Sequence, residues 1–163
     1  MTAIHAAVLQ ALASSPLAAE LSPADCEVLA TRVRLHKLAA GQVVGSEGTV
    51  DDRLFVVVDG TLSVVKYAGT ANETLLTTLR AGDLAHELGF LDGTPRHASL
   101  VAAEASQLLE LSRVDLDSLV DSHPRILYAV MCAIVRAVHR VQTRLSAQAS
   151  ELTNYVFKQH GRY

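Results

Sequence analysis

Seven short apolar runs fill the middle of the chain, and turns rich in glycine or charged residues separate them. The runs are 34–38, 42–44, 54–58, 62–67, 75–79, 99–103 and 108–111. Many short strands with regularly spaced turns are typical of an all-β sandwich or a jelly-roll-like barrel. Asp59-Gly60 lies between two of the runs and has the composition of a hairpin turn, so we expect its flanking strands to pair.

Signals for helices flank this β region on both sides. They are a helical spacing over 2–12 with Thr2 as N-cap, a start at Ser22-Pro23-Ala24-Asp25 for a helix to about Arg32, and a start at Ser112-Arg113-Val114-Asp115 for a helix to about Val120. From Arg125 onward neither proline nor glycine occurs before Gly161, which predicts one helix of about 30 residues or more. The expected fold class is mainly β with flanking helices.

The long helix carries two adjacent apolar stripes. The first stripe follows alternating steps of four and three, as the seam of a coiled coil does: Leu127, Met131, Ile134, Val138, Val141 and Leu145. The second stripe is Ile126, Val130, Ala133 and Ala137. One stripe can pack on the β-domain while the other pairs with the same helix of a second chain, so we expect a homodimer. A helix packed wholly within a monomer is the alternative.

The composition fits a single globular domain. The 163 residues suit one domain of ordinary size, and half of them are apolar, so a substantial core can form. Cys26 and Cys132 lie in helix-like apolar patterns, which favours reduced, buried thiols in a cytoplasmic protein. No stretch approaches the roughly 18 consecutive apolar residues that cross a bilayer, so we expect no membrane span.

The charge is distributed unevenly along the chain, whose net charge is −3. Residues 1–122 have a net charge of −8, whereas residues 123–163 have a net charge of +5. A basic helical end can contact nucleic acid or an acidic partner, and it can equally be a solvated helix face. We divide the chain into 1–122, the N-terminal helices and β-region, and 123–163, the long helix and its tail. The tail, 154–163, has the aromatic and basic composition of a protein interface, although a frayed terminus is the alternative.

The segment 82–102, GDLAHELGFLDGTPRHASLVA, holds the residues with the clearest chemistry. Its glycines let a ligand approach backbone N–H groups closely. Glu87 can accept hydrogen bonds from a sugar hydroxyl, and the planar guanidinium of Arg96 can donate two parallel hydrogen bonds to a phosphate. Together the two side chains can hold a ribose phosphate. The alternative is a structural role for Arg96, paired with Asp83 or Glu87.

This segment resembles the phosphate-binding cassette of the cyclic nucleotide-binding domain family, whose pattern is G-D-x-x-G-E-L, six further residues, and P-R-x-A-T/S. The matching residues are Gly82, Asp83, Glu87, Leu88, Pro95, Arg96, Ala98 and Ser99. The stretch from Gly41 to Gly48 and the run LFVVVDG resemble further family segments, so the resemblance covers roughly residues 16–145. It implies a β-roll of about eight strands followed by a long helix, with cAMP, or else cGMP, as the ligand and no metal.

The resemblance also implies roles for individual residues. The family's glutamate binds the ribose 2′-hydroxyl and its arginine binds the cyclic phosphate, and these roles fall to Glu87 and Arg96. The family usually has glycine where this chain has His86, which can crowd the ligand, add a cation near the phosphate, or simply pack. It usually has Ala, Ser or Thr at the position of His97, which can change the choice of purine. The other expected ligand-binding residues are Leu88, Ala98, Ser99 and, where the long helix reaches the purine, Gln142 and Thr143.

The resemblance implies a regulatory module that binds a cyclic mononucleotide and signals through a protein partner. About 18 residues follow Leu145, too few for a helix-turn-helix module, so DNA is not an expected partner. The sequence has no nucleophile elbow and no P-loop, so we do not expect an enzyme. Two alternatives remain open. One is a partner-binding scaffold whose pocket is degenerate because of His86, and the other is a cupin-like metal enzyme that uses His86, Glu87 and His97.

Overall fold

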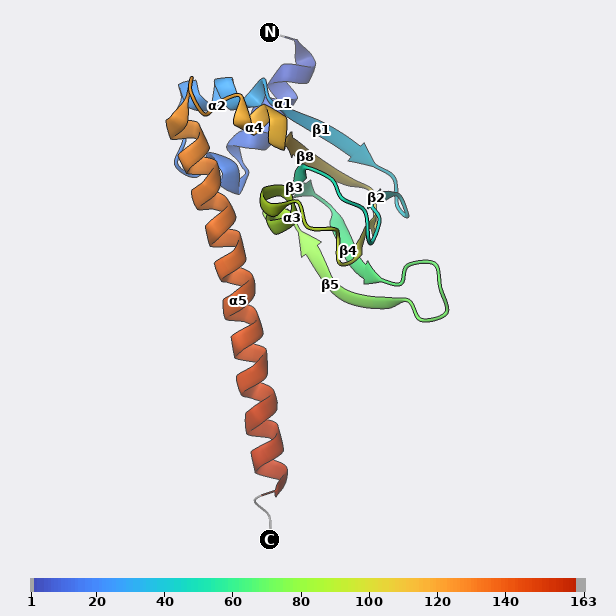
Figure 1. Ribbon diagram of the computed structural model, residues 1–163. Helices are drawn as coiled ribbons and strands as arrows, with labels where there is room; N and C mark the ends of the chain where they lie inside the picture. Colours follow the sequence, from blue (N-terminus) through green and yellow to red (C-terminus); the bar gives the residue numbers. More distant parts are fainter. Residues whose placement is uncertain (1, 161–163) are drawn as a thin grey trace.

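Two four-stranded antiparallel sheets form a β-roll, and a long helix extends away from it (Figure 1). The computed structural model describes residues 2–160, with side chains described through residue 158. The strands are β1 (Val33–Leu38), β2 (Val43–Gly45), β3 (Arg53–Asp59), β4 (Thr61–Lys66), β5 (Thr74–Arg80), β6 (Leu84–Ala85), β7 (Ser99–Ala102) and β8 (Ser106–Ser112). The strand orders are β1-β8-β3-β6 and β2-β7-β4-β5, which confirms the predicted eight-stranded β-roll. The two-residue strand β6 was not among the predicted runs, because two residues are too few to give a pattern.

The prediction of a hairpin at Asp59-Gly60 is wrong. β3 pairs with β6 and β8, whereas β4 pairs with β5 and β7, so the turn carries the chain from one sheet to the other. Gly60 has a φ of +82°, and a Cβ at this position would lie 2.3 Å from the hydroxyl oxygen of Ser106. The turn is therefore as tight as its glycine indicates, although the strands on either side pair with other neighbours. The hairpin in this part of the fold joins β4 to β5.

Successive side chains of β3 face two separate cores. Leu54 and Val56 belong to a core between the first sheet and the helices, whereas Phe55 and Val57 belong to a smaller core inside the roll. Because side chains alternate between the two faces of a strand, a strand buried on both faces is apolar at every position. This is why the run 54–58 shows no polar alternation.

Short helices cover the outer face of the first sheet. They are α1 (Ala3–Ala13), the 3₁₀ helix η1 (Pro16–Ala18), α2 (Pro23–Ala30) and α4 (Arg113–Asp117). Thr2 caps α1, and Ser22 forms a reciprocal capping box with Asp25 at the start of α2, as predicted. Ser112 caps α4 as predicted, but α4 ends at Asp117, and turns rather than helix lead on to α5.

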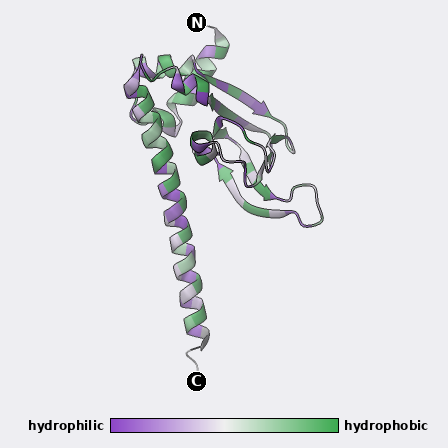
Figure 2. Ribbon diagram, in the orientation of Figure 1, coloured by the Kyte–Doolittle hydropathy of each residue, from purple (hydrophilic) through white to green (hydrophobic). Residues whose placement is uncertain are grey.

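Helix α5 (Pro124–His160) contacts η1 and runs far past the roll (Figures 1 and 2). The second stripe is buried in the helical core, as predicted: Ile126, Val130, Ala133 and Ala137. Every side chain from residue 139 to residue 158 is exposed. Ile134, which its spacing placed in the first stripe, is 1% exposed and packs in the same core of its own chain. The first stripe therefore cannot serve unchanged as the face for a partner.

Two further features bear on the predictions for the helices. Both cysteines are free, but only Cys26 is buried as predicted, since Cys132 is half-buried. Burial, together with the nearby carboxylates of Asp25 and Glu27, raises the pKa of the Cys26 thiol. Residues 124–158 are long and apolar enough to cross a membrane by length and composition alone, a test that the core helix of a globular domain also passes.

Candidate functional site

The cassette begins with a strained turn between β6 and α3 (Glu87–Asp92). His86 has a φ of +66°, in the left-handed region that normally favours glycine. Its imidazole lies directly over Gly89, where a Cβ would come within 2.1 Å of the ring carbon Cε1. The glycine at 89 thus makes room for the histidine at 86. Because the His86 ring points inward, only 7% of its side chain is exposed.

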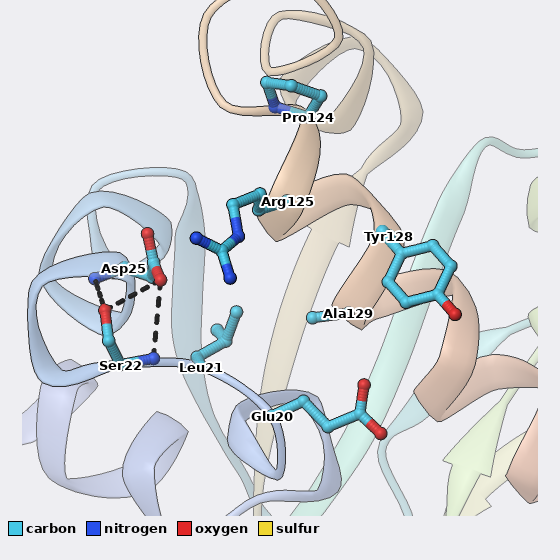
Figure 3. A pocket seen from close by; sticks show the side chains of 8 residues that line it. All are labelled: Glu20, Leu21, Ser22, Asp25, Pro124, Arg125, Tyr128 and Ala129. Carbon is cyan, nitrogen blue, oxygen red and sulfur yellow. Dashed lines mark hydrogen bonds between the residues drawn. The ribbon is translucent and has the colours of Figure 1, made fainter.

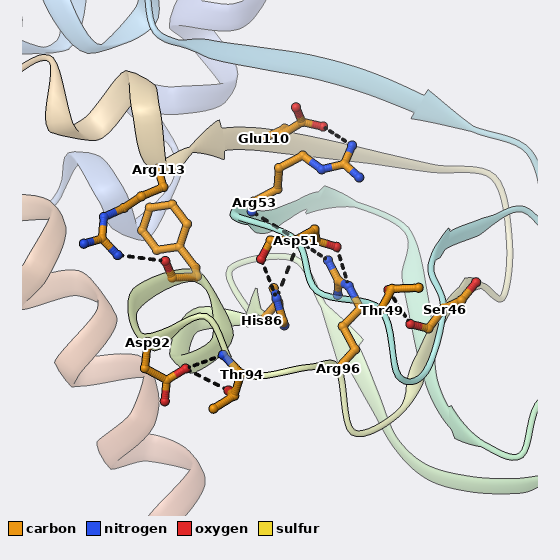
Figure 4. Close-up of polar contacts among 11 residues, drawn as sticks. Ser46, Thr49, Asp51, Arg53, His86, Asp92, Thr94, Arg96, Glu110 and Arg113 are labelled. Atoms are coloured by element: carbon orange, nitrogen blue, oxygen red, sulfur yellow. Dashed lines mark hydrogen bonds and ion pairs between the residues drawn. The ribbon is translucent and has the colours of Figure 1, made fainter.

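Arg96, which belongs to the cassette, is held in place from several sides (Figure 4). Its Nε and Nη2 atoms donate hydrogen bonds to the Asp51 carboxylate at 2.7 and 3.1 Å. The guanidinium carbon lies 5.5 Å from the centre of the Phe55 ring, and the whole residue is 5% exposed. Gly45 faces the guanidinium so closely that a Cβ there would lie 2.5 Å from Nε. The result is a buried, oriented cation.

The backbone of Arg96 is fixed as well as its side chain. Its N–H donates to the Thr49 carbonyl at 2.9 Å, and its own carbonyl accepts from the Gly48 N–H at 2.7 Å. These bonds join the cassette to the loop between β2 and β3, which also carries Asp51. Of the two predictions for Arg96, the structural alternative named the wrong carboxylates, since neither Asp83 nor Glu87 pairs with it in the described residues.

Asp51 is the site residue that the sequence interpretation missed. Burial on its own would raise the pKa of the Asp51 carboxyl, but hydrogen bonds from Arg96 and from the Arg53 N–H lower the pKa overall. His86 adds a third contact, since its Nε2 lies 3.2 Å from the Asp51 carbonyl oxygen and 3.5 Å from Oδ1. Asp51 is 45 residues from Arg96 in sequence, and it lies in a loop with no periodic pattern, so no sequence signal linked the two residues.

The structure brings Glu87 to the first turn of α3, immediately after His86. Its side chain is half-buried and makes no hydrogen bond or ion pair with the residues that the structure describes, so its oxygens are available to a ligand. Leu88, the next residue of α3, is 56% exposed. The His97 side chain is also exposed, and the His97 carbonyl accepts a hydrogen bond of 2.7 Å from Lys66 Nζ. The polar groups expected to hold a ribose phosphate thus lie on one cassette.

Ala98 and Ser99 are buried at the start of β7, as the strand pattern implies. The Ser99 hydroxyl accepts a 3.0 Å hydrogen bond from the Glu47 N–H, so one of its lone pairs has a structural partner. The Glu47 carboxylate pairs with Lys66 at 2.6 Å, and hydrogen bonds from Lys66 and from the Tyr67 N–H lower the pKa of Glu47. This small network connects the loop after β2 to β4 and to the start of β7.

Gln142 and Thr143 do not lie at the cassette within one chain. Both are exposed on the part of α5 that extends beyond the roll (Figure 1). The Thr143 hydroxyl donates to the His139 carbonyl of its own helix at 3.0 Å. Their predicted contact with a purine therefore stays a prediction, and a single chain in this arrangement does not provide it.

A hollow of about 400 Å³ lies between the Asp51 loop and α3, and Arg113 and Phe90 are among the residues that line it. The Arg113 guanidinium donates to the carbonyls of Phe90 at 3.2 Å and Leu91 at 2.6 Å, at the end of α3. It also bonds to Asp117 of α4 at 3.1 Å. A cation at a helix C-terminus stabilises the exposed carbonyls of its last turn. Arg113 therefore fastens the cassette helix to α4.

A second hollow, of about 510 Å³, opens between α2 and the start of α5 (Figure 3). Its lining is mixed in charge, with Glu20 and Asp25 on one side and Arg125 and Tyr128 on the other. None of the predicted ligand-binding residues lies there. No group of three metal-ligating side chains occurs within the described part of the chain.

Comparison with known proteins agrees with this geometry. A cyclic nucleotide-gated potassium channel of Mesorhizobium japonicum is 33% identical over 117 residues, which are 72% of this chain and 31% of the channel. A CRP-like cAMP-activated global transcriptional regulator of Mycobacterium tuberculosis is 24% identical over 126 residues, which are 77% of this chain and 56% of the regulator. The chain thus spans less than two thirds of the length of either relative.

The fold has close counterparts among solved structures. A cyclic nucleotide-binding domain from Methylobacillus flagellatus superposes with a TM-score of 0.69 and 21% identity, over 95% of this chain and 83% of that one. The sequence profile of the cyclic nucleotide-binding domain matches residues 35–123, which include the β-roll from β1 onward, the whole cassette and α4. A chain with this roll, this cassette and this profile belongs to the cyclic nucleotide-binding domain family.

Proposed function

We propose that this chain binds a cyclic mononucleotide, which is cAMP, with cGMP as the alternative. Arg96 binds the cyclic phosphate and Glu87 binds the ribose. The observation that carries the proposal is the buried Arg96 guanidinium, held in a fixed plane by Asp51, in the same cassette as Glu87, whose carboxylate makes no hydrogen bond or ion pair with the described residues. The cAMP-activated regulator among the relatives supports the choice of nucleotide.

Asp51 orients Arg96 for the phosphate. An arginine guanidinium has five N–H donors, one on Nε and two on each Nη atom. Asp51 accepts hydrogen bonds only from the edge formed by Nε and Nη2. The remaining Nη1 and Nη2 hydrogens can donate to a phosphate while the Asp51 bonds persist. A preorganised guanidinium loses less conformational entropy on binding than a mobile one.

The output of the module is a change passed to another protein. The chain acts as a cytoplasmic regulatory binder and not as an enzyme, and α5 pairs with its copy in a homodimer. The exposed apolar side chains along α5 support the pairing, and the basic, aromatic end of the helix supports a protein partner. The relatives include a channel and a transcription regulator, so one type of sensor serves different outputs.

Calorimetric titration with cAMP and cGMP tests the nucleotide assignment. Arg96→Ala leaves a buried phosphate without its cation, at a cost of about 2–5 kcal/mol, which lowers affinity roughly 30- to 5,000-fold. Arg80→Ala is the matched control, because Arg80 is exposed at the end of β5 and should leave affinity unchanged. Equal nucleotide affinity of the wild type and Arg96→Ala would refute the assignment.

Thermal unfolding with added ligands separates the two alternatives from the proposal. A ligand that binds only the folded chain stabilises it by RT ln(1 + [L]/Kd), so the melting temperature rises with ligand concentration. A shift with nucleotide supports the proposal. No shift with either nucleotide favours a scaffold with a degenerate pocket, and a shift with divalent metal alone favours the cupin-like reading.

A further inference from the structure

Two local features fix the imidazole of His86 in one place. Among the described residues other than glycine, only His86 and Tyr67 have a positive φ, a conformation that is uncommon for residues with a side chain. The ring also needs the space over Gly89, where no other residue would fit without displacing it. Residues held in such conformations gather at functional sites, so the position of His86 calls for a functional explanation.

The fixed imidazole points at Asp51 and away from solvent (Figure 4). Its Nε2 atom lies 3.2 Å from the Asp51 carbonyl oxygen and 3.5 Å from Oδ1 of the same residue. A carbonyl oxygen only accepts hydrogen bonds, so Nε2 carries a hydrogen in either charge state and the titrating proton is the one on Nδ1. Histidine is the side chain whose charge ordinarily changes between about pH 5 and pH 8. A change in the charge of His86 therefore acts first on Asp51.

Charged groups surround His86 from the three segments packed against it. The loop before β3 contributes Asp51, α3 contributes Asp92, and the segment after α3 contributes Arg96 across the Asp51 carboxylate. Hydrogen bonds from Thr94 lower the pKa of Asp92, and the charge of His86 acts in the same direction. These two carboxylates and one guanidinium sum to −1 around a neutral imidazole and to zero around a protonated one.

One atom, Oδ1 of Asp51, is shared between His86 and Arg96. Arg96 donates its shorter bond, 2.7 Å from Nε, to Oδ2, and its longer bond, 3.1 Å from Nη2, to Oδ1. His86 Nε2 approaches that same Oδ1. A positive charge on the imidazole partly neutralises the carboxylate while both bonds to Arg96 persist. The guanidinium then keeps its orientation, and more of its charge is left to attract an anion on its free edge.

We propose that His86 is a positioning residue that couples nucleotide binding to pH, because its protonated imidazole shares Asp51 with Arg96 and so strengthens the attraction of Arg96 for the cyclic phosphate. This inference rests on the proposed function and deepens it, since His86 acts through Asp51 and not on the ligand. Coupling between two binding events is reciprocal. Binding of the nucleotide therefore favours the protonated imidazole, and the complex takes up a fraction of a proton.

Calorimetric titration with cAMP tests this coupling at about pH 6 and about pH 8, in buffers of different ionisation enthalpy. The cyclic phosphate keeps its single negative charge over this range, so a change in affinity arises from the protein. The wild type should bind about five- to tenfold more tightly at the lower pH, the lower end of the usual range for coupled sites. Its binding enthalpy should depend on the buffer, which reports proton uptake.

His86→Gln removes the titrating group but keeps an N–H that can donate to the Asp51 carbonyl. It should bind cAMP with the same affinity at both pH values and without proton uptake. His86→Asn should behave in the same way, and it guards against misfolding because asparagine tolerates a positive φ. If both variants fold and keep the pH dependence of the wild type, the inference is wrong.

His36→Gln is the matched control. His36 also lies beside a carboxylate, 3.0 Å from Glu110, but it belongs to β1 and not to the cassette. This variant should retain the pH dependence and the proton uptake of the wild type. Loss of both in His97→Gln, with both retained in His86→Gln, would assign the coupling to the exposed histidine of the cassette and overturn the inference.

Nuclear magnetic resonance of the chain without nucleotide separates this inference from the proposed function. The ring signals of His86, assigned by their absence in His86→Gln, should titrate at a lower pH in Asp51→Asn than in the wild type, because an amide stabilises the imidazolium less than a carboxylate does. An unchanged midpoint would overturn the inference. A wild type that binds cAMP equally at both pH values refutes the coupling alone, whereas a wild type that binds neither nucleotide refutes the proposed function and the coupling with it.

Discussion

Replacing Asp51 with alanine tests whether the ion pair with Arg96 organises the nucleotide site. The change removes both carboxylate oxygens that accept from the Arg96 guanidinium, and it leaves in place a side chain that is only 4% exposed. The cation then remains in a site with the Phe55 ring on one side and, among the residues that the structure describes, no counter-charge in hydrogen-bond contact. Removing one partner of a buried ion pair is far more disruptive than removing both.

The expected loss of stability follows from that burial. Breaking a buried pair by deleting one charge costs about 3–5 kcal/mol in general. Since 14% of the Asp51 side chain is exposed, water can partly replace the lost carboxylate, so we expect the lower end, about 3 kcal/mol. Removing Arg96 as well should recover part of this loss, and the double variant measures the coupling between the two residues.

Urea unfolding with and without cAMP is the assay. Because Asp51 holds the Arg96 guanidinium in the orientation that the phosphate needs, cAMP should bind Asp51→Ala more weakly, and a given cAMP concentration should stabilise this variant less than it stabilises the wild type. Asp52→Ala is the matched control: its side chain is exposed one residue away, and its stability should stay within about 0.5 kcal/mol of the wild type. If Asp51→Ala unfolds at the same urea concentration as Asp52→Ala, the ion pair does not organise the site.

Three further predictions concern the left-handed turn at His86 and the carboxylate of Asp51. His86→Gly should be more stable than His86→Ala by about 1 kcal/mol in urea unfolding, because only glycine relieves the positive φ; equal stabilities would show that the turn is unstrained. Gly89→Ala should cost about 1–3 kcal/mol, because its Cβ meets the imidazole, and the cost should fall in the His86→Gly background; a cost that does not change there would contradict the packing. Folding lowers the pKa of Asp51, so its contribution to stability is present above the ordinary value of about 3.9 and is lost as the pH falls below it. Asp51→Asn should therefore flatten the loss of stability between about pH 4 and pH 2, and an acid unfolding curve as steep as that of the wild type would contradict this.

Local patterns in the sequence predicted the fold well because each element has a short-range cause. The caps at Thr2, Ser22 and Ser112 lie where the residue types placed them. Pairing between strands is a long-range property, which is why Asp59-Gly60 was interpreted as a hairpin although it joins two sheets. A turn sequence determines how the chain bends but not which strands become neighbours.

The sequence predicted some residues of the candidate site and missed others. Glu87 and Arg96 were found because they belong to one contiguous pattern of residues. Asp51 was missed because an ion pair across 45 residues leaves no trace in a single sequence. The first stripe of α5 included Ile134, which the structure buries in the chain's own core, since heptad spacing alone cannot decide which of two neighbouring stripes the domain buries. Only the burial of Ile134 in its own core decides that question.

The contacts around Asp51 and Arg113 join the cassette to α4, the last helix before α5. Asp51 holds Arg96, and the next carbonyl in the chain, that of Asp52, accepts a 2.8 Å hydrogen bond from the Arg113 N–H. The Arg113 side chain in turn holds the last carbonyls of α3 and the Asp117 carboxylate of α4, which precedes α5.

A ligand changes α5 only if it has different contacts in two arrangements of these elements, and we propose that a shift of Arg96 or of α3 on binding supplies that difference. We therefore expect cAMP to slow amide hydrogen exchange both in α3 and in the turns after α4. Arg113→Ala leaves the α3 carbonyls without their cation, so the protection should remain at α3 and be lost after α4. Val114→Ala is the control, because Val114 is exposed on the same short helix. Protection after α4 that persists in Arg113→Ala would show that the signal reaches α5 by another route.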